Sequence, residues 1–302
     1  GYAAKTTGLT KVIACGSGFA PGMKSSSLLI PEYVGIVGLQ DMNLTEMITD
    51  YKLSLEITSE HYLMMFTGTH EWPDSYTYRE AYIILNSTNP EVLETVLNDE
   101  KEKILRLLGK NMIMEAYFSC LSLYNFFNQE EMQPTPVCIN NIDADKANSL
   151  LKNEKEEIYK FTNALDLIRS ESQGLNIEKK TKLWWETEIE KIMYKLEYSK
   201  NPRIINENKR LLSFISFNAF EYAMILIKFE KKYEYATEFL EIWSLTSPGS
   251  PLPYYTLARN YMRLKKSRLA KKNLDAAMER GLLEFVNPEV DTIISPLIYR
   301  NK

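Results

Sequence analysis

The sequence lacks several features that would assign it to a functional class at once. Its 302 residues contain three cysteines, Cys15, Cys120 and Cys138. They are too few and too scattered for a disulfide framework or a thiolate metal site. No run approaches the roughly twenty apolar residues of a membrane span. There is no phosphate-cradling glycine loop, metal-ligand cluster or His-Glu-x-x-His motif. The sequence therefore predicts no cofactor, no bound metal and no membrane span.

The sequence also lacks a strong excess of charge of either sign. Lysine and arginine number 36 against 40 aspartates and glutamates, which gives a net charge of -4 at pH 7. A nucleic-acid-binding surface needs a basic stripe, so we predict no nucleic-acid partner. Hydrophobic residues make up 45% and charged residues 25% of the chain, as in a typical globular protein. The length is sufficient for two domains, each with its own core.

What the sequence does contain is an alternation of strand and helix patterns before residue 90. Apolar runs at Leu9–Cys15, Tyr33–Val37 and His61–Phe66 predict three strands. The spacing in Met42–Leu55 and Asp74–Asn86 predicts helices. This alternation is typical of a parallel sheet with right-handed crossovers. Because three strands alone make a poor domain, we expect them to be the last three of a larger sheet, whose earlier half this chain does not contain.

From Pro90 onward the pattern is helical, without strand-like runs. The range Asn98–Asn128 opens with charged residues that suit the start of a helix, and apolar residues follow at helical spacing. Asp143 stands where a helix N-cap is expected. Lys182–Tyr198 is amphipathic and predicts a further helix.

The C-terminal third contains an internal repeat with an offset of 34 residues, the length of a tetratricopeptide repeat. The offset pairs Ala236 with Ala270 and Leu240 with Leu274, and the small residues would let two helices approach closely. Two repeats fall short of the roughly three that a free-standing stack needs, so we expect them to pack against the preceding helices. The residues whose spacing resembles the tetratricopeptide signature are Tyr254, Leu257, Ala258, Tyr261, Ala270, Leu274 and Ala277.

Two polar residues follow neighbouring predicted strands. Asp41 comes shortly after the second strand, and His70 follows the third strand on a turn that contains a glycine. Because parallel strands end at the same edge of a sheet, we expect the carboxylate and the imidazole to meet there. The alternative for Asp41 is N-capping of the following helix, a role that Asn43 or Glu46 could share.

The surroundings of both residues resemble the acid and histidine turns of the α/β-hydrolase family, whose triad runs nucleophile, acid, histidine. The motifs are Gly-x-x-Asp-x-Asn-x-x-Glu-Met (residues 38–47) and Gly-Thr-His-Glu-Trp-Pro (residues 68–73). They look like a bacterial hydrolase subfamily with a helical, repeat-like tail. The resemblance implies a serine hydrolase with esterase-like chemistry and a small ester-like substrate. In it, His70 would accept the proton of the nucleophile and Asp41 would orient the imidazole.

The nucleophile is the one member of the triad for which the sequence offers no well-matched residue. A nucleophile elbow reads Gly-x-Ser-x-Gly between a strand and a helix. Ser17 precedes the acid and the histidine in the right order, but Cys15 and Phe19 stand where the glycines should be. In the family, residues 9–16 match the strand that lies between the nucleophile strand and the acid strand. We therefore expect the elbow, and the oxyanion donors, to lie outside this chain.

These observations predict an α/β fold followed by an all-α region. We expect residues 1–89 to be the carboxyl-terminal portion of an α/β-hydrolase domain, residues 90–210 a helical connecting region and residues 211–302 tetratricopeptide-like repeats. Two functions fit. The chain is either the part of a serine hydrolase that carries the acid and the histidine, or an interaction module. In the second case the repeat helices bind a peptide or protein partner, and the hydrolase-derived portion is a non-catalytic scaffold.

Overall fold

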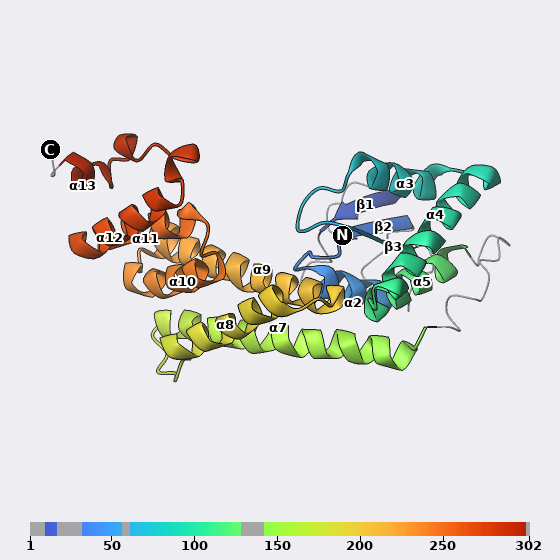
Figure 1. The fold of residues 1–302 in the computed structure, drawn as a ribbon, viewed down its shortest axis with the longest axis horizontal. Coiled ribbons are helices and arrows are strands. Elements are labelled where there is room, and N and C mark those ends of the chain that lie inside the picture. The colour runs from blue at the N-terminus through green and yellow to red at the C-terminus, as the bar shows by residue number, and fades with distance from the viewer. Residues whose placement is uncertain (1–9, 17–31, 56–60, 128–141, 300–302) are drawn as a thin grey trace. The chain divides into compact units, whose positions relative to one another are not determined.

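The computed structural model describes residues 10–16, 32–55, 61–127 and 142–299 (Figure 1). A small parallel sheet is followed by helices, which confirms the predicted order of α/β and then all-α in its coarse form. The three described strands fall short of a full α/β-hydrolase sheet. The chain divides into two compact units: unit 1 is Gly1–Glu157 with Lys195–Leu211, and unit 2 is Ile158–Tyr194 with Leu212–Lys302. The predicted division into three functional parts stays a prediction.

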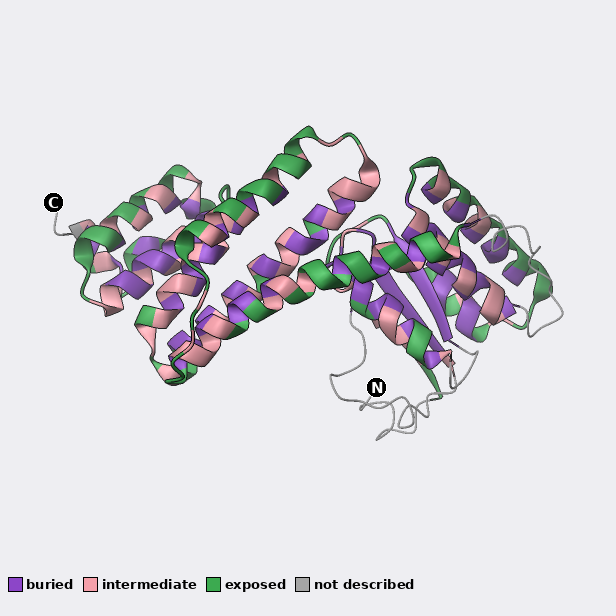
Figure 2. Ribbon diagram, turned by 90° about the horizontal axis from the view of Figure 1, so that it is seen from below, coloured by how far each residue is buried: buried purple, intermediate pink, exposed green. Residues whose placement is uncertain are grey.

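The sheet of unit 1 has the strand order β1-β2-β3, and both neighbouring pairs are parallel. Gly38 pairs with Phe66, so β2 and β3 end side by side. The side chains of β3 and most of β2 are buried, as expected for strands covered on both faces (Figure 2). The strands and the two helices that follow them lie where the sequence predicts them: β1 (Lys11–Cys15), β2 (Glu32–Gly38), α2 (Leu44–Ser54), β3 (His61–Phe66) and α3 (Ser75–Asn86).

Unit 1 continues with α4 (Pro90–Gly109) and α5 (Ile113–Phe127), and α5 packs against β3. The prediction of a helix start at Asn98 is wrong, because α4 begins at Pro90 with Asn89 as its N-cap. The continuous helical pattern is also broken before Ile113. There Asn111 adopts a left-handed conformation (φ 57°), which asparagine tolerates better than most residues. The predicted cap of α7 (Ala144–Ser172) is confirmed, since Asp143 Oδ1 accepts a hydrogen bond from the Lys146 backbone N–H at 2.8 Å.

The described part of unit 2 is helical. Helix α8 has the predicted bounds, and α11 packs against both α10 and α12. The repeat positions Ala236, Leu240, Ala270 and Leu274 are buried, as the spacing predicts; their identity as tetratricopeptide repeats stays a prediction. The helices are α8 (Lys182–Tyr198), α9 (Pro202–Ile225), the π-helical turn η2 (Leu226–Glu230), α10 (Tyr233–Thr246), α11 (Pro251–Arg263), α12 (Ser267–Glu279), η3 (Leu282–Glu284), η4 (Pro288–Val290) and α13 (Ser295–Tyr299), with α7, α8 and α9 contributing to both units.

Two observations concern features that the sequence does not predict, a membrane-spanning helix and a disulfide bond. Among the described residues, one helical stretch, Pro202–Glu230, is long and apolar enough to cross a membrane by length and composition, with 33% of its most apolar window buried. Core helices of folded proteins pass the same test, so the prediction of no membrane span stays a prediction. Cys15 is free, whereas Cys120 is disulfide-bonded. The spacing of the cysteines did not predict this bond.

A buried ionic cluster joins three helices of unit 1 to the end of β2. Arg210 on α9 is 1% exposed, and its Nε and Nη2 donate to the two carboxylate oxygens of Glu154 at 2.6 and 2.7 Å. Its Nη1 donates to Glu115 Oε1 at 3.2 Å and to the Leu39 carbonyl oxygen at 2.5 Å. Burial raises the pKa of the Glu115 carboxyl, and Arg210 counteracts this rise. The paired charges thus hold α5, α7 and α9 at the carboxyl edge of the sheet.

Replacing Arg210 by methionine should destabilise the chain strongly, because Glu154 and Glu115 would stay buried without a cation. We expect the free energy of unfolding to fall by about 3–5 kcal/mol, measured by urea denaturation at pH 7. The loss should shrink at acid pH, where the carboxyls are protonated. The control is Arg106→Gln, which removes an exposed pair with Glu102 and should change stability by less than about 1 kcal/mol. Equal losses in the two variants would contradict a special role for the buried cluster.

Candidate active site

Asp41 lies in the turn that leads from β2 into α2. Its backbone N–H donates to the Gly38 carbonyl oxygen at 3.0 Å, and its Oδ1 accepts from the Asn43 N–H at 2.9 Å. The N-cap of α2 is Asn43, whose side chain makes no capping bond and instead donates to the Gly16 carbonyl oxygen at 2.5 Å. Asp41 is therefore not the N-cap of α2. Its fully buried carboxylate faces the sheet edge.

His70 lies in the turn that follows β3, and backbone hydrogen bonds attach this turn to that of Asp41. The Leu39 N–H donates to the Phe66 carbonyl oxygen at 2.8 Å, and the Gln40 N–H donates to the Gly68 carbonyl oxygen at 2.9 Å. The ladder between β2 and β3 thus extends beyond the strands themselves. As a result, the turn that contains Asp41 and the turn that contains His70 lie close together.

Gly38 allows the two turns to approach. A Cβ atom at this position would lie 2.5 Å from the carbonyl oxygens of both Gly68 and Thr69. Side-chain carbons do not approach backbone oxygens so closely, and those oxygens belong to the turn that carries His70. Position 38 therefore accepts only glycine if the turn is to keep this place.

The predicted meeting of the carboxylate and the imidazole is confirmed. His70 Nδ1 lies 3.1 Å from Asp41 Oδ1 and 3.3 Å from Oδ2. The Asp41 side chain is 1% exposed, whereas that of His70 is 47% exposed. A carboxylate only accepts hydrogen bonds, so it selects the imidazole tautomer that is protonated on Nδ1 and leaves Nε2 as the proton acceptor. This is the geometry of a general base oriented by an acid.

The buried position makes the Asp41 carboxylate costly to ionise. Burial raises the pKa of the Asp41 carboxyl, while the Asn43 N–H and His70 oppose the rise. The interactions that hold the carboxylate in place therefore compensate only part of its lost hydration.

The end of β1 completes this small site. Gly16 has a positive φ of 59°, and a Cβ atom there would lie 3.0 Å from Asp41 Oδ2 and 3.2 Å from His70 Nδ1. A side chain at this position would press on both members of the pair. The glycines that end the apolar runs of β1 and β2 were visible in the sequence, but their contacts were not. Ser17, the weak nucleophile candidate, lies outside the described residues.

Helix α9 supplies residues that the sequence did not indicate. Asn206 Oδ1 accepts from Gln40 Nε2 at 3.0 Å, and Lys209 Nζ donates to Gln40 Oε1 at 3.2 Å. Together with the bond from Arg210 to the Leu39 carbonyl, they fix the two residues that directly precede Asp41. The predicted helical connecting region therefore contributes to the positioning of the acid.

The remaining observations limit what else this site can do. Among the described residues, no group of three or more histidine, cysteine, aspartate or glutamate side chains is placed to hold a metal ion. Trp72, next to the His70 turn, is 82% exposed and is not a core residue. Comparison of the chain with models of protein families, with curated proteins and with solved structures gave no match.

Replacing Gly38 by alanine should separate His70 from Asp41, because the added methyl group displaces the Gly68–Thr69 backbone. We expect unfolding to become easier by about 1–3 kcal/mol. The Nδ1–H signal of His70 in ¹H–¹⁵N spectra of the imidazole rings should also be lost. The chain has two histidines, so His61 serves as an internal reference. Gly109→Ala is the control, since nothing lies within 4 Å of its Cβ position. An unchanged His70 signal in Gly38→Ala would refute this role of Gly38.

The stability of Asp41→Asn relative to the wild type should depend on pH. Below the usual carboxyl pKa of 3.8, Asp41 is protonated in both the folded and the unfolded chain, so its ionisation costs nothing. As the pH rises through the raised pKa of the folded state, the buried carboxyl ionises and the wild type loses stability. The Tm of Asp41→Asn minus that of the wild type should therefore be more positive at pH 7 than at pH 3.5. A difference that is independent of pH would contradict this.

Proposed function

We propose that Asp41 and His70 are the acid and the base of a serine-hydrolase triad of the α/β-hydrolase type. The observation that carries the proposal is the contact of His70 Nδ1 with a fully buried carboxylate at the shared edge of two parallel strands. In this proposal the chain is the carboxyl-terminal part of the enzyme. The nucleophile elbow and the oxyanion donors come from a segment that this sequence does not include, and the substrate is a small ester-like molecule.

The half-exposed imidazole suits such a reaction. His70 Nε2 takes the proton from the serine hydroxyl as the oxygen attacks the ester carbonyl, and then gives this proton to the departing alkoxide. The Asp41 carboxylate stabilises the imidazolium that exists between these two transfers and keeps the ring in its orientation. In the second half of the reaction, the same nitrogen takes a proton from a water molecule as the water oxygen attacks the acyl-enzyme carbonyl. It then gives this proton to the serine oxygen as the bond between the serine and the acid product breaks. The pair thus returns to its starting state after each turnover.

The direct test uses the full-length protein that includes the elbow and a small activated ester. His70→Ala should lower kcat by roughly 10⁴-fold or more, because the base is lost. Asp41→Asn should lower it strongly but less completely, and circular dichroism should show both variants folded. Glu71→Gln changes the exposed neighbour of His70 and should keep nearly full activity. Hydrolysis that survives in His70→Ala would remove this residue from the mechanism.

The source of the nucleophile can be tested separately on the 302-residue chain. We expect this chain alone not to hydrolyse the ester and not to react with a fluorophosphonate, a reagent that labels activated serines. The full-length protein should be labelled, and at a serine outside this chain. If the chain alone is labelled and Ser17→Ala prevents it, Ser17 is the nucleophile and the proposed missing elbow is wrong.

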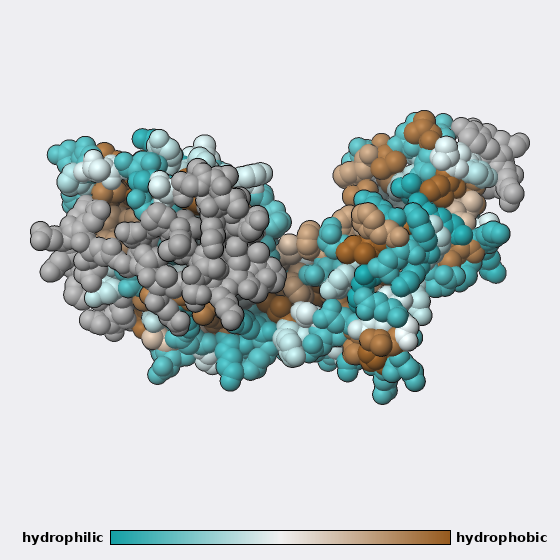
Figure 3. All heavy atoms as spheres, turned by 180° about the vertical axis from the view of Figure 1, so that it is seen from behind, coloured by the Kyte–Doolittle hydropathy of each residue, from teal (hydrophilic) through white to brown (hydrophobic). Residues whose placement is uncertain are grey.

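The second candidate is an interaction module, in which the repeat helices bind a peptide or protein partner and the sheet is a scaffold. It is favoured by the burial of the repeat positions between α10, α11 and α12. On the face that Figure 3 shows, apolar patches are scattered among hydrophilic side chains. The fluorophosphonate experiment separates the two candidates. A full-length protein that has no reactive serine, although Asp41 and His70 are in contact, would favour the module.

A further inference from the structure

Unit 1 contains a cavity of about 440 Å³ at the carboxyl edge of its sheet. Its walls include Gln40 after β2, Thr67 after β3, the start of α3, the second half of α4 and Asn206 on α9. Asp41 and His70 are not among the lining residues. The volume lies within the range of small-molecule sites, roughly 300–1,000 Å³. Ligands of parallel sheets usually bind outside the carboxyl ends of the strands.

The lining combines an apolar side with polar groups. Phe66, Leu107 and Met112 are buried residues that face the cavity. The hydroxyl or amide side chains of Gln40, Thr67, Thr77 and Asn206 also line it. Such a surface suits a ligand with an apolar body and a polar end.

The charges in the lining are mostly positive. Lys103 and Arg106 lie three residues apart on one face of α4, and Lys110 is the C-cap residue directly after this helix. Asp74 is the single acid among the lining residues, and its carboxylate already accepts the Thr77 N–H at 2.7 Å as the N-cap of α3. The cavity therefore favours an anion over a cation.

The three cations differ in how far they are already engaged. Lys103 Nζ lies 2.6 Å from carboxylate oxygens of both Glu80 and Glu100, so its charge is compensated. Arg106 reaches Glu102 only at 3.4 Å, and both of these side chains are more than half exposed. Lys110 forms no ion pair in the part of the chain that the structure describes. Arg106 and Lys110 are thus the groups that can bind a ligand charge.

We propose that this cavity binds a small organic anion, in which a carboxylate or phosphate head group is attached to an apolar body. The planar guanidinium of Arg106 can donate two parallel hydrogen bonds to the head group, and Lys110 adds a second charge. The apolar body packs against Phe66, Leu107 and Met112. The proposal is independent of the hydrolase function, since neither Asp41 nor His70 takes part.

The test is a calorimetric titration of the 302-residue chain with phenyl phosphate, benzoate and inorganic phosphate at low salt. We expect phenyl phosphate to bind more tightly than inorganic phosphate, because only the former has an apolar body. The amide signals of Thr67 and Thr77 should shift on binding. Arg106→Gln combined with Lys110→Gln should weaken phenyl phosphate binding about tenfold or more. Both side chains are exposed, so the fold should be retained.

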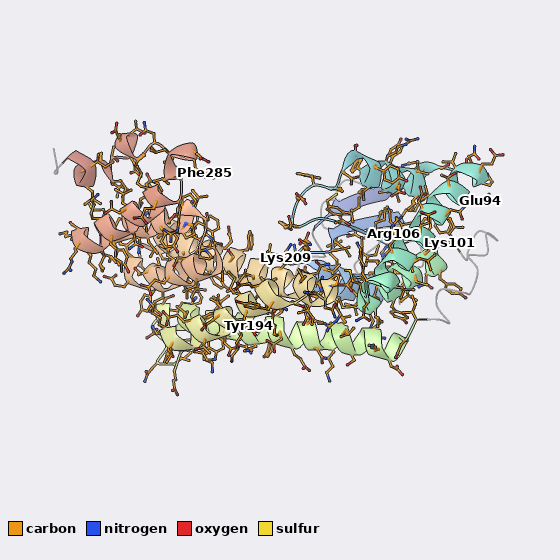
Figure 4. All side chains as sticks on the ribbon, viewed as in Figure 1. Glu94, Lys101, Arg106, Tyr194, Lys209 and Phe285 are labelled. Atoms are coloured by element: carbon orange, nitrogen blue, oxygen red, sulfur yellow. The ribbon has the colours of Figure 1, made fainter. Side chains whose placement is uncertain are left out.

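The matched control is Lys101→Gln combined with Lys152→Gln, which removes the same amount of charge. Lys101 is on α4 like Arg106 (Figure 4) but does not line the cavity, and Lys152 is an exposed residue of α7. We expect this variant to bind like the wild type. Equal weakening in the two variants would mean a general charge effect and would overturn the proposal. So would the absence of phenyl phosphate binding, or inorganic phosphate binding as tightly as phenyl phosphate.

Discussion

The close approach of two backbone turns is the constraint on which the candidate site depends. Strands β2 and β3 end side by side, and their hydrogen bonding continues into the turns beyond them. Gly38 leaves the space that the Gly68–Thr69 backbone occupies. The carboxylate of one turn then reaches the imidazole of the other without any long side chain having to be held in an extended conformation. Two short side chains on fixed backbone lose little conformational freedom when they meet.

Helices from much later in the chain reinforce this arrangement. Arg210 bonds to the carbonyl of Leu39, and Asn206 and Lys209 bond to the side chain of Gln40. The residues before Asp41 are thus held both by the neighbouring strand and by α9. Supporting hydrogen bonds of this kind hold an acid and a base in the correct relative position in designed and natural sites. The helical part of unit 1 therefore positions residues next to the candidate site in addition to covering the sheet.

The same edge of the sheet carries two environments of different character. Around Asp41, a buried carboxylate whose pKa burial raises lies beside a half-exposed imidazole, which suits proton transfer. In the cavity lined by Arg106 and Lys110, the charges are positive and open to solvent, which suits binding. The carboxyl ends of parallel strands can support both, because each strand is followed by a turn that leaves the sheet in its own direction.

The amino-acid sequence by itself determined the elements whose signals are local. The apolar run of β3, the amphipathic pattern of α8 and the cap at Asp143 lie where they were predicted. The parallel arrangement, and with it the meeting of Asp41 and His70, followed from the alternation of strands and helices. Each of these depends on residues that are close together along the chain, or on the general geometry of parallel strands.

Only the tertiary structure decided the features that join distant parts of the chain. The contacts of Gly16 and Gly38 and the bond of Arg210 to the Leu39 carbonyl, directly after β2, all involve residues that are far apart in the sequence. A glycine that ends a strand has the same local sequence pattern whether it contacts another backbone segment or solvent. An arginine in an amphipathic helix likewise does not indicate which carboxylates will surround it. Periodicity specifies which face of an element is buried, and the packing of the whole unit specifies what that face contacts.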